Sequence, residues 1–270
     1  MMARRPLMNK PLVEAIFELR WAGTPQAPGI HHDPHYRLLV GRLHERVCGS
    51  YPCHEQLPTA ALPDELVGYM VQHRFRAGED QWPLLQVGPG IMTLNDTANY
   101  TWEDFRTRAA DAVGSLIEAH PQPDALRVVA LTLRYIDAVR LDYVADDVLA
   151  FLRQMMRVTV SLPPTLLADP TIGRAPEHLQ LETRYRSGRP PGSAALRFTT
   201  GQRDGQPSLI WESVVQSTDA DVPEITGGFA DWLEAAHDLT DDWFFKLIEG
   251  DLERRFAGEC ADDGAGAGAQ

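Results

Sequence analysis

The sequence predicts an α+β protein in which a mostly antiparallel, curved sheet packs against long helices. Some segments alternate apolar and polar residues as half-buried strands do, others carry apolar residues at helical spacing, and both kinds occur in the same order twice. That order is strand, helix, three strands, helix, and it predicts a tandem structural duplication. We expect a first half at 1–123, a second half at 124–257 sharing one sheet or core, and a disordered tail at 258–270.

The first half opens with a strand at Leu12–Trp21, because its apolar residues fall on one face and its charged residues fall on the other. A turn-rich stretch follows at 23–29. Apolar residues then recur at helical spacing over 36–47, after a proline at position 34 that suits a first helical turn. We expect a helix there.

Three further strands and a second helix complete the first half. Alternating residues at 69–75 predict one strand, and those at 83–87 and 91–95 predict a hairpin about a Gly-Pro-Gly turn. Thr101 is placed to cap the helix that follows, with Asp104 at the capping-box position.

The second half repeats this order of elements. Alternation at 126–141 is long and predicts a central strand, and apolar spacing at 148–156 predicts a helix. A proline-rich loop precedes three predicted strands at 178–186, 194–200 and 208–216. Apolar residues from Phe229 to Phe256 form one stripe, which predicts the longest amphipathic helix of the chain.

The composition narrows the class of partner. Lys and Arg total 25 against 38 Asp and Glu, which gives a formal net charge of −13. Such an acidic chain repels phosphate backbones and anionic membranes, so we expect neither nucleic acid nor a membrane as partner. Three scattered cysteines suit a reducing compartment, and the first dozen residues hold no apolar run of signal-peptide length. We therefore expect a cytoplasmic protein.

Arginines on the predicted strands are the main candidates for ligand binding. Their forked donors suit carboxylate and phosphate groups, and several strands can project them onto one sheet face. Ion pairs with Glu14, Glu18, Glu182 or Glu212 explain the same arginines without any ligand. The candidates are Arg74, Arg76, Arg134, Arg184 and Arg186, and the other strand arginines are Arg20 and Arg197.

Histidines before and within the first predicted helix form an alternative site. His31, His32, His35 and His44 are residue types that suit zinc, and His44 shares a helical face with Cys48. Their spacing matches no established zinc pattern, and a solvated loop beside a buried Cys48 is the competing interpretation. This alternative is a metal-dependent enzyme subunit, whereas the main interpretation needs no metal and no cofactor.

The remaining titratable groups favour structural roles. Cys53 and His54 are adjacent in sequence, and the side chains of adjacent residues seldom point at each other. This argues against a cysteine nucleophile with a histidine base at these positions. Asp137 and Asp142 lie at or after the end of the long strand, where solvated charge is expected. His237 lies at the edge of the last apolar stripe and is expected to be a boundary histidine with one satisfied nitrogen.

Three segments carry a resemblance to a known family. They are PLVEAIFELRW at 11–21, LLQVGPGIMTLND at 84–96 with Tyr100 and Trp102 to Phe105 after it, and AHDLTDDWFFKLIEGDLERRF at 236–256. They resemble a sporadically distributed family of bacterial and archaeal proteins that has no assigned function. The resemblance spans nearly the whole chain and implies a shared fold. A patchy distribution implies an accessory component of a multi-protein bacterial system, such as defence or peptide modification.

These observations predict a non-enzymatic binding or adaptor protein. We expect it to recognise a protein, peptide or small anionic ligand in a groove of the sheet, because a curved sheet against helices often leaves one. No catalytic motif in the chain is specific enough to name a reaction. Apolar surface around Trp243 and Phe244 in the last helix also permits a homodimer.

Overall fold

The computed structural model describes residues 7–27, 30–63, 67–97, 99–169, 171–173 and 175–259, without the side chains of residues 26, 27, 30, 31 and 164. Its helices are α1 (Tyr36–Val47), α2 (Trp102–Ala119), α3 (Val148–Met155), α4 (Ile225–Ile248) and α5 (Asp251–Phe256). Its strands are β1 (Leu12–Trp21), β2 (Thr24–Ala27), β3 (Ile30–His32), β4 (Cys53–Gln56), β5 (His73–Arg76), β6 (Leu84–Gly88), β7 (Ile91–Asp96), β8 (Val128–Arg140), β9 (Gln180–Gly188), β10 (Pro191–Arg203) and β11 (Gln206–Thr218).

One nine-stranded sheet organises the described part of the chain, in the order β4-β5-β6-β7-β1-β8-β11-β10-β9. Every neighbouring pair is antiparallel. The first half of the chain supplies β4 to β1 and the second half supplies β8 to β9, so the halves join where β1 pairs with β8. The predicted α+β class is confirmed, and the predicted duplication and domain bounds stay predictions.

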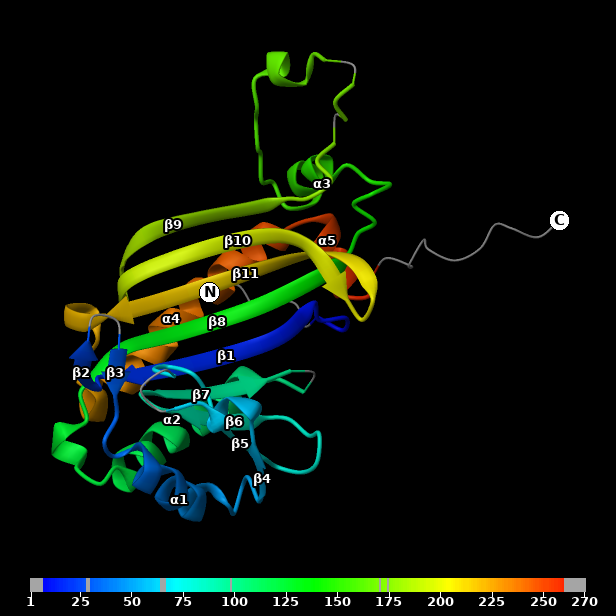
Figure 1. Ribbon diagram of the computed structural model, residues 1–270. Helices are drawn as coiled ribbons and strands as arrows, with labels where there is room; N and C mark the ends of the chain where they lie inside the picture. The colour runs from blue at the N-terminus through cyan, green and yellow to red at the C-terminus, as the bar shows by residue number, and fades with distance from the viewer. Residues whose placement is uncertain are drawn as a thin grey trace.

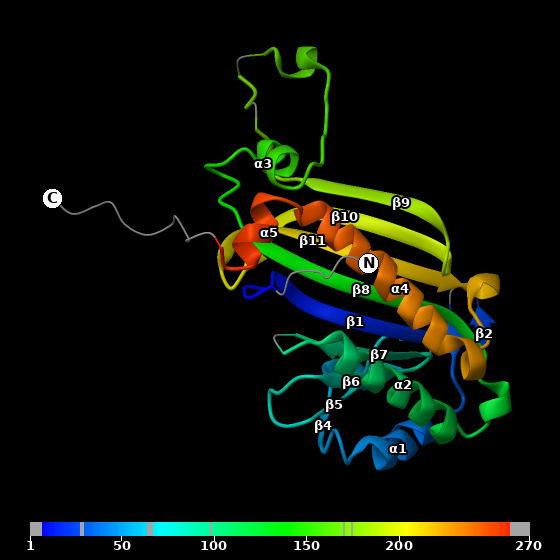
Figure 2. The same cartoon turned by 180° about the vertical axis from the view of Figure 1, so that it is seen from behind.

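Three helices cover one face of this sheet. Seen from behind, α1, α2 and α4 lie across it (Figure 2), whereas the described helices leave the opposite face open (Figure 1). Alternation puts Phe17 and Leu19 of β1 and Leu131 and Leu133 of β8 on the covered face, where all four are fully buried. Each such side chain contributes about 1.5–3 kcal/mol when it leaves water.

A second core lies at the other end of the central strands. Trp211 of β11 and Val139 of β8 pack there with residues of α3, the end of α4 and α5. This core holds α5 against the sheet and leaves the beginning of α4 to pack in the larger core with α1 and α2. The two cores thus cover the same side of the sheet.

Most of the predicted elements are present with nearly the expected bounds. The strand at Leu12–Trp21 is β1, and the helix over 36–47 is α1. The predicted cap of α2 is confirmed, because the Asp104 N–H donates to Thr101 Oγ1 at 3.4 Å. These elements follow from local signals, namely alternation, helical spacing and a capping side chain.

Three predictions in the first half were wrong in detail. The turn-rich stretch at 23–29 holds β2 and the first part of a small hairpin with β3. The strand expected over 69–75 begins only at His73, because Tyr69 has a left-handed backbone with φ 62°. Strand β4 was not predicted, since all four of its residues are exposed and leave no alternating pattern.

The single long helix expected at the end of the second half is also wrong. Helix α4 ends at Ile248 and α5 begins at Asp251, because Gly250 adopts φ 113°, a backbone conformation that favours glycine and ends a helix. The apolar stripe continues across the break, since Leu252 and Phe256 of α5 reach the second core. Of the tail predicted to be disordered, residues 260–270 lie outside the described residues.

Candidate functional site

The face of the sheet opposite α1, α2 and α4, called here the uncovered face, carries the arginines that the sequence singles out. The strand register sets side chains of Glu55, Arg74, Gln86, Thr93 and Glu18 in one row across it. The same register places on this face all seven arginines that the sequence singles out on strands: Arg20, Arg74, Arg76, Arg134, Arg184, Arg186 and Arg197. Their role as ligand contacts stays a prediction.

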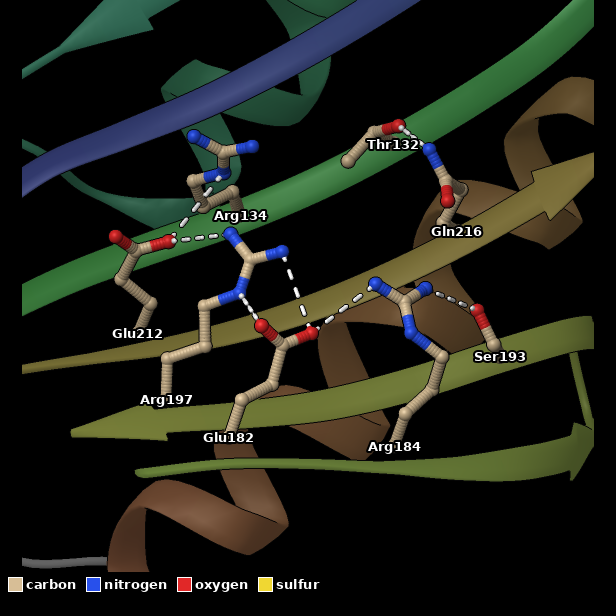
Figure 3. Close-up of polar contacts among 8 residues, drawn as sticks. All are labelled: Thr132, Arg134, Glu182, Arg184, Ser193, Arg197, Glu212 and Gln216. Carbon is tan, nitrogen blue, oxygen red and sulfur yellow. Dashed lines mark hydrogen bonds and ion pairs between the residues drawn. The ribbon is translucent and has the colours of Figure 1, made fainter. Parts of the chain in front are cut away.

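A chain of ion pairs crosses the second half of the uncovered face (Figure 3). Arg134 Nε of β8 lies 3.8 Å from Glu212 Oε2 of β11, and Arg197 Nη1 of β10 lies 3.5 Å from the same oxygen. Arg197 Nε lies 3.1 Å from Glu182 Oε2 of β9, and Arg184 Nη2 lies 3.3 Å from Glu182 Oε1. The charges alternate, so each guanidinium in this chain has a carboxylate neighbour.

A second polar chain crosses the first half of the same face. Arg74 Nη1 of β5 lies 3.1 Å from Glu55 Oε2 of β4, and its Nε donates to Gln86 Oε1 of β6 at 3.1 Å. The Gln86 amide donates to Asn95 Oδ1 of β7 at 3.1 Å, and the Asn95 amide donates to Glu14 Oε1 of β1 at 2.8 Å. Five neighbouring strands are therefore tied together by side chains as well as by their backbones.

The other arginines of this face are paired too. Arg76 Nε lies 3.5 Å from Glu55 Oε2, and Arg20 Nε lies 2.7 Å from Glu18 Oε1. Arg186 donates through both terminal nitrogens to Asp221, at 2.8 and 2.9 Å. The partners Glu18, Glu182 and Glu212 confirm the ion-pair interpretation of the sequence, and the partners Glu55 and Asp221 were missed because they lie in segments without a strand pattern.

The outer edge of β9 carries two exposed arginines. Among the described strands β9 pairs only with β10, so its other side is an edge of the sheet (Figure 1). The side chains of Arg184 and Arg186 are 46% and 74% exposed, well above the 14% and 25% of Arg76 and Arg74 near the opposite edge. An edge strand leaves alternate backbone N–H and C=O groups unpaired, ready for a further strand.

A pocket lies on the covered side of the sheet, between the sheet and α4. This pocket of about 220 Å³ is lined by β8, β11, α4 and the segment before β1. Its polar centre is a hydrogen-bonded relay in which Tyr135 OH of β8 lies 2.7 Å from Tyr100 OH and 3.0 Å from His237 Nδ1 of α4. The Trp102 ring stacks on His237, with centroids 3.8 Å apart.

Two buried polar side chains face this pocket beside the relay. Asp137 of β8 is 3% exposed and Ser213 of β11 is 1% exposed, and both line the cavity. Within the described residues, no hydrogen bond reaches the Asp137 carboxyl or Ser213 Oγ. Desolvation raises the pKa of Asp137 to about 8, although the nearby charge of Arg203 opposes the rise.

The structure corrects the expected environment of Asp137 and supports that of His237. Asp137 is buried, not solvated, because it continues the covered-side series of Leu131, Leu133 and Tyr135 along β8. The alternation of residues along this strand was the pattern in the sequence that could have predicted this burial. His237 is a boundary histidine with Nδ1 bonded to Tyr135, as expected.

The histidines of the alternative metal hypothesis are not brought together. His35 packs edge-on against His120, and His44 stacks on Phe75 and lies near His54. The side chain of His31 lies outside the described residues. Among the described residues, no group of three His, Cys, Asp or Glu side chains could hold a metal ion.

The cysteines give no support for a metal or nucleophilic site. Cys48 is exposed, so the predicted burial of this residue is wrong; its Sγ contacts the Glu45 carbonyl at 3.2 Å. Cys53 is also exposed on β4, and it lies on the face opposite to His54 because adjacent strand residues point to opposite sides.

Comparison with known protein families, with curated proteins and with solved structures finds no match to this chain. In the part of the chain that the structure describes, no helix combines the length and apolar character needed to cross a membrane.

Proposed function

We propose that this chain is a non-enzymatic binding or adaptor protein that recognises an extended, acidic segment of a partner protein along strand β9. The observation that carries the proposal is the gathering of the seven arginines predicted on strands on the uncovered face, with Arg184 and Arg186 at one edge of the sheet. An added strand on β9 gains backbone hydrogen bonds, and every second side chain of that strand falls beside these two arginines.

The charges favour an acidic partner. The seven predicted arginines outnumber the carboxylates of Glu14, Glu18, Glu55, Glu182 and Glu212 on the uncovered face, whereas the chain as a whole carries a formal charge of −13. Exposed ion pairs such as Arg184–Glu182 contribute only about 0–1 kcal/mol, so a partner's carboxylate can replace the internal one at little cost. Each guanidinium also has five N–H donors, more than its internal partner uses.

The wider role follows from the family resemblance of the segments at 11–21, 84–105 and 236–256. It supports an accessory component of a multi-protein bacterial system, of the defence or peptide-modification type. A cytoplasmic location is part of the same proposal, because the acidic composition and the scattered cysteines favour it.

Labelled peptides of alternating composition test the proposal directly. Nine-residue peptides in which threonine alternates with glutamate, glutamine or lysine are titrated with the full chain, and fluorescence anisotropy is measured. We expect the glutamate peptide to bind about tenfold more tightly than the other two, a difference of about 1.4 kcal/mol. Its affinity should fall with added salt, because exposed charges are screened.

Two variants locate the binding site. Replacing both Arg184 and Arg186 by Ala should remove the preference for the glutamate peptide and leave the melting temperature nearly unchanged, since both side chains are exposed. Arg106→Ala is the matched control, because Arg106 pairs with Glu234 of α4 on the covered side. Equal binding of the three peptides, or an unchanged preference in the double variant, would refute the proposed function.

A further inference from the structure

The pocket beneath α4 is a second binding site, separate from the uncovered face. It lies on the opposite side of the sheet from Arg184 and Arg186 and contains none of the strand arginines. We propose that it binds a small organic cation, a primary ammonium group on an apolar body, with Asp137 and Ser213 as the groups that receive the ammonium. This inference does not depend on the proposed function of β9.

Burial of unpartnered oxygens is the first reason. A polar group that leaves water without a hydrogen bond costs about 1–3 kcal/mol, and an isolated carboxylate costs more. Ser213 Oγ carries this cost, and Asp137, which is 3% exposed, lies on the neighbouring strand in the same cavity. An ammonium group has three N–H donors, which can satisfy a carboxylate and a hydroxyl at once.

The charges around the cavity favour a cation over an anion. Asp137 and Asp241 contribute two carboxyl groups to the wall, and Lys10 is the single lysine in it. The Lys10 ammonium is held at the rim, where it donates to the Tyr100 carbonyl at 3.0 Å. A ligand carboxylate would meet the carboxyl groups of Asp137 and Asp241, whereas Arg203, whose charge acts on Asp137, does not line the pocket.

The walls fit a short apolar body. Leu12, Phe244 and Phe245 line the pocket together with the rings of Tyr100 and Tyr135. Ring faces also attract cations, which adds to the affinity for an ammonium group. A volume of about 220 Å³ lies below the roughly 300–1,000 Å³ of sites for drug-sized ligands, so the ligand is small, of the size of a single ring or a short chain.

Binding should release a proton. Below about pH 8 the Asp137 carboxyl holds its proton in the empty pocket. An arriving ammonium ion keeps its own proton and favours the carboxylate, so the carboxyl proton passes to solvent and charge is conserved. One proton per bound cation is the upper limit, and this release is a signature that nonspecific binding of an amine to the acidic surface lacks.

Three probes of one size test the charge of the ligand. Benzylamine, benzyl alcohol and benzoate are titrated calorimetrically into the full chain near pH 7, in buffers that differ in ionisation enthalpy. We expect benzylamine to bind about tenfold or more tightly than the other two and to release protons. Binding of benzylamine no tighter than benzyl alcohol, or binding without proton release, would overturn the inference.

Matched substitutions locate the site. Asp137→Asn should reduce benzylamine affinity to that of benzyl alcohol and abolish proton release, and Ser213→Ala should weaken benzylamine alone. Asp111→Asn removes the same charge from an exposed position on α2, outside the pocket, and should change nothing. If Asp137→Asn does not fold, carbon NMR of the Asp137 carboxyl decides on the wild type. Saturating benzylamine must then lower its titration midpoint, and an unmoved midpoint refutes the site.

Discussion

The hydroxyl of Tyr135 on β8 lies 3.0 Å from Nδ1 of His237 on α4 and so joins the centre of the sheet to the longest helix. The same hydroxyl lies 2.7 Å from Tyr100 OH, ahead of α2. Burial raises the pKa of both tyrosines, so the two hydroxyls stay neutral at physiological pH. One side chain thus connects three segments that are distant in sequence.

Removal of this hydroxyl should destabilise the fold. Tyr135→Phe leaves Tyr100 OH and His237 Nδ1 without their shared partner, and we expect a loss of about 1–3 kcal/mol in the free energy of unfolding, measured with urea. Tyr185→Phe is the control, because its ring is 55% exposed and still contacts Trp243; its effect should stay within about 0.5 kcal/mol. Equal effects of the two changes would contradict the relay.

Ionisation of Asp137 should make stability fall as the pH rises. The carboxyl titrates at about 8 in the folded chain and at 3.8 in the unfolded chain, so between these values the folded state binds more protons. The free energy of unfolding contributed by this group therefore decreases from about pH 4 to pH 8. Asp137→Asn removes that decrease, and urea unfolding of both proteins at several pH values measures the difference.

A substitution at a second carboxyl group is the control for Asp137→Asn. Asp111→Asn on the exposed side of α2 should leave the pH dependence as in the wild type. If the curves of wild type and Asp137→Asn run parallel between pH 5 and 8, the carboxyl does not hold its proton and the environment inferred for it is wrong.

The stacked imidazoles of His54 and His73 should have the opposite effect, because they make the free energy of unfolding increase as the pH rises. His54 Nε2 lies 2.9 Å from His73 Nδ1, and desolvation lowers the pKa of both residues, with further lowering from the charge of His44 on His54 and of His54 on His73. Between the lowered pKa and 6.5 the unfolded chain binds more protons, so this stabilisation is lost as the pH falls below 6.5.

Proton NMR of the imidazole rings measures this directly. Both midpoints should lie below 6.5, and His54→Asn should raise the midpoint of His73, because a neighbouring charge is removed. A midpoint of either ring at or above 6.5 would contradict the stacked arrangement.

The sequence predicts secondary structure well, and it also predicts which residues of one strand share a face. Strand β1 and helix α1 follow from periods of two and 3.6 residues, and Arg184 and Arg186 share a face because they are two residues apart. That Arg74 joins them on the same face depends on the register of all the strands between β5 and β9. No local pattern contains that information.

The pocket beneath α4 could not be assembled from the sequence. Tyr135 and His237 are 102 residues apart, and only the docking of α4 on the sheet brings them together. Asp137 was placed among solvated carboxylates, although its phase with Leu133 on β8 indicated the covered side. The neighbours of the candidate metal histidines were not predictable either, because His35 contacts His120 and His44 contacts His54, each from a segment distant from the predicted cluster.

The contact of Gly88 with the segment before β5 leads to a last prediction. A Cβ built on Gly88 would lie 1.9 Å from the Met70 carbonyl oxygen, a backbone atom that cannot move away easily. The segment is also held by hydrogen bonds from Tyr69 N–H to the Pro89 carbonyl and from Gln72 N–H to the Val87 carbonyl, both 2.9 Å. Gly88→Ala should therefore cost about 1–3 kcal/mol of stability by overpacking.

Gly114→Ala is the matched substitution, and it should raise the stability that Gly88→Ala lowers. Gly114 lies in the middle of α2 with nothing within 4 Å of a built Cβ, so alanine only improves the helix there, by about 0.5–1 kcal/mol. Urea unfolding of both variants measures the two effects in one experiment. A Gly88→Ala protein as stable as the wild type would mean that the chain at 69–71 does not lie across β6, and the uncovered face would then extend further toward β5 than the structure describes.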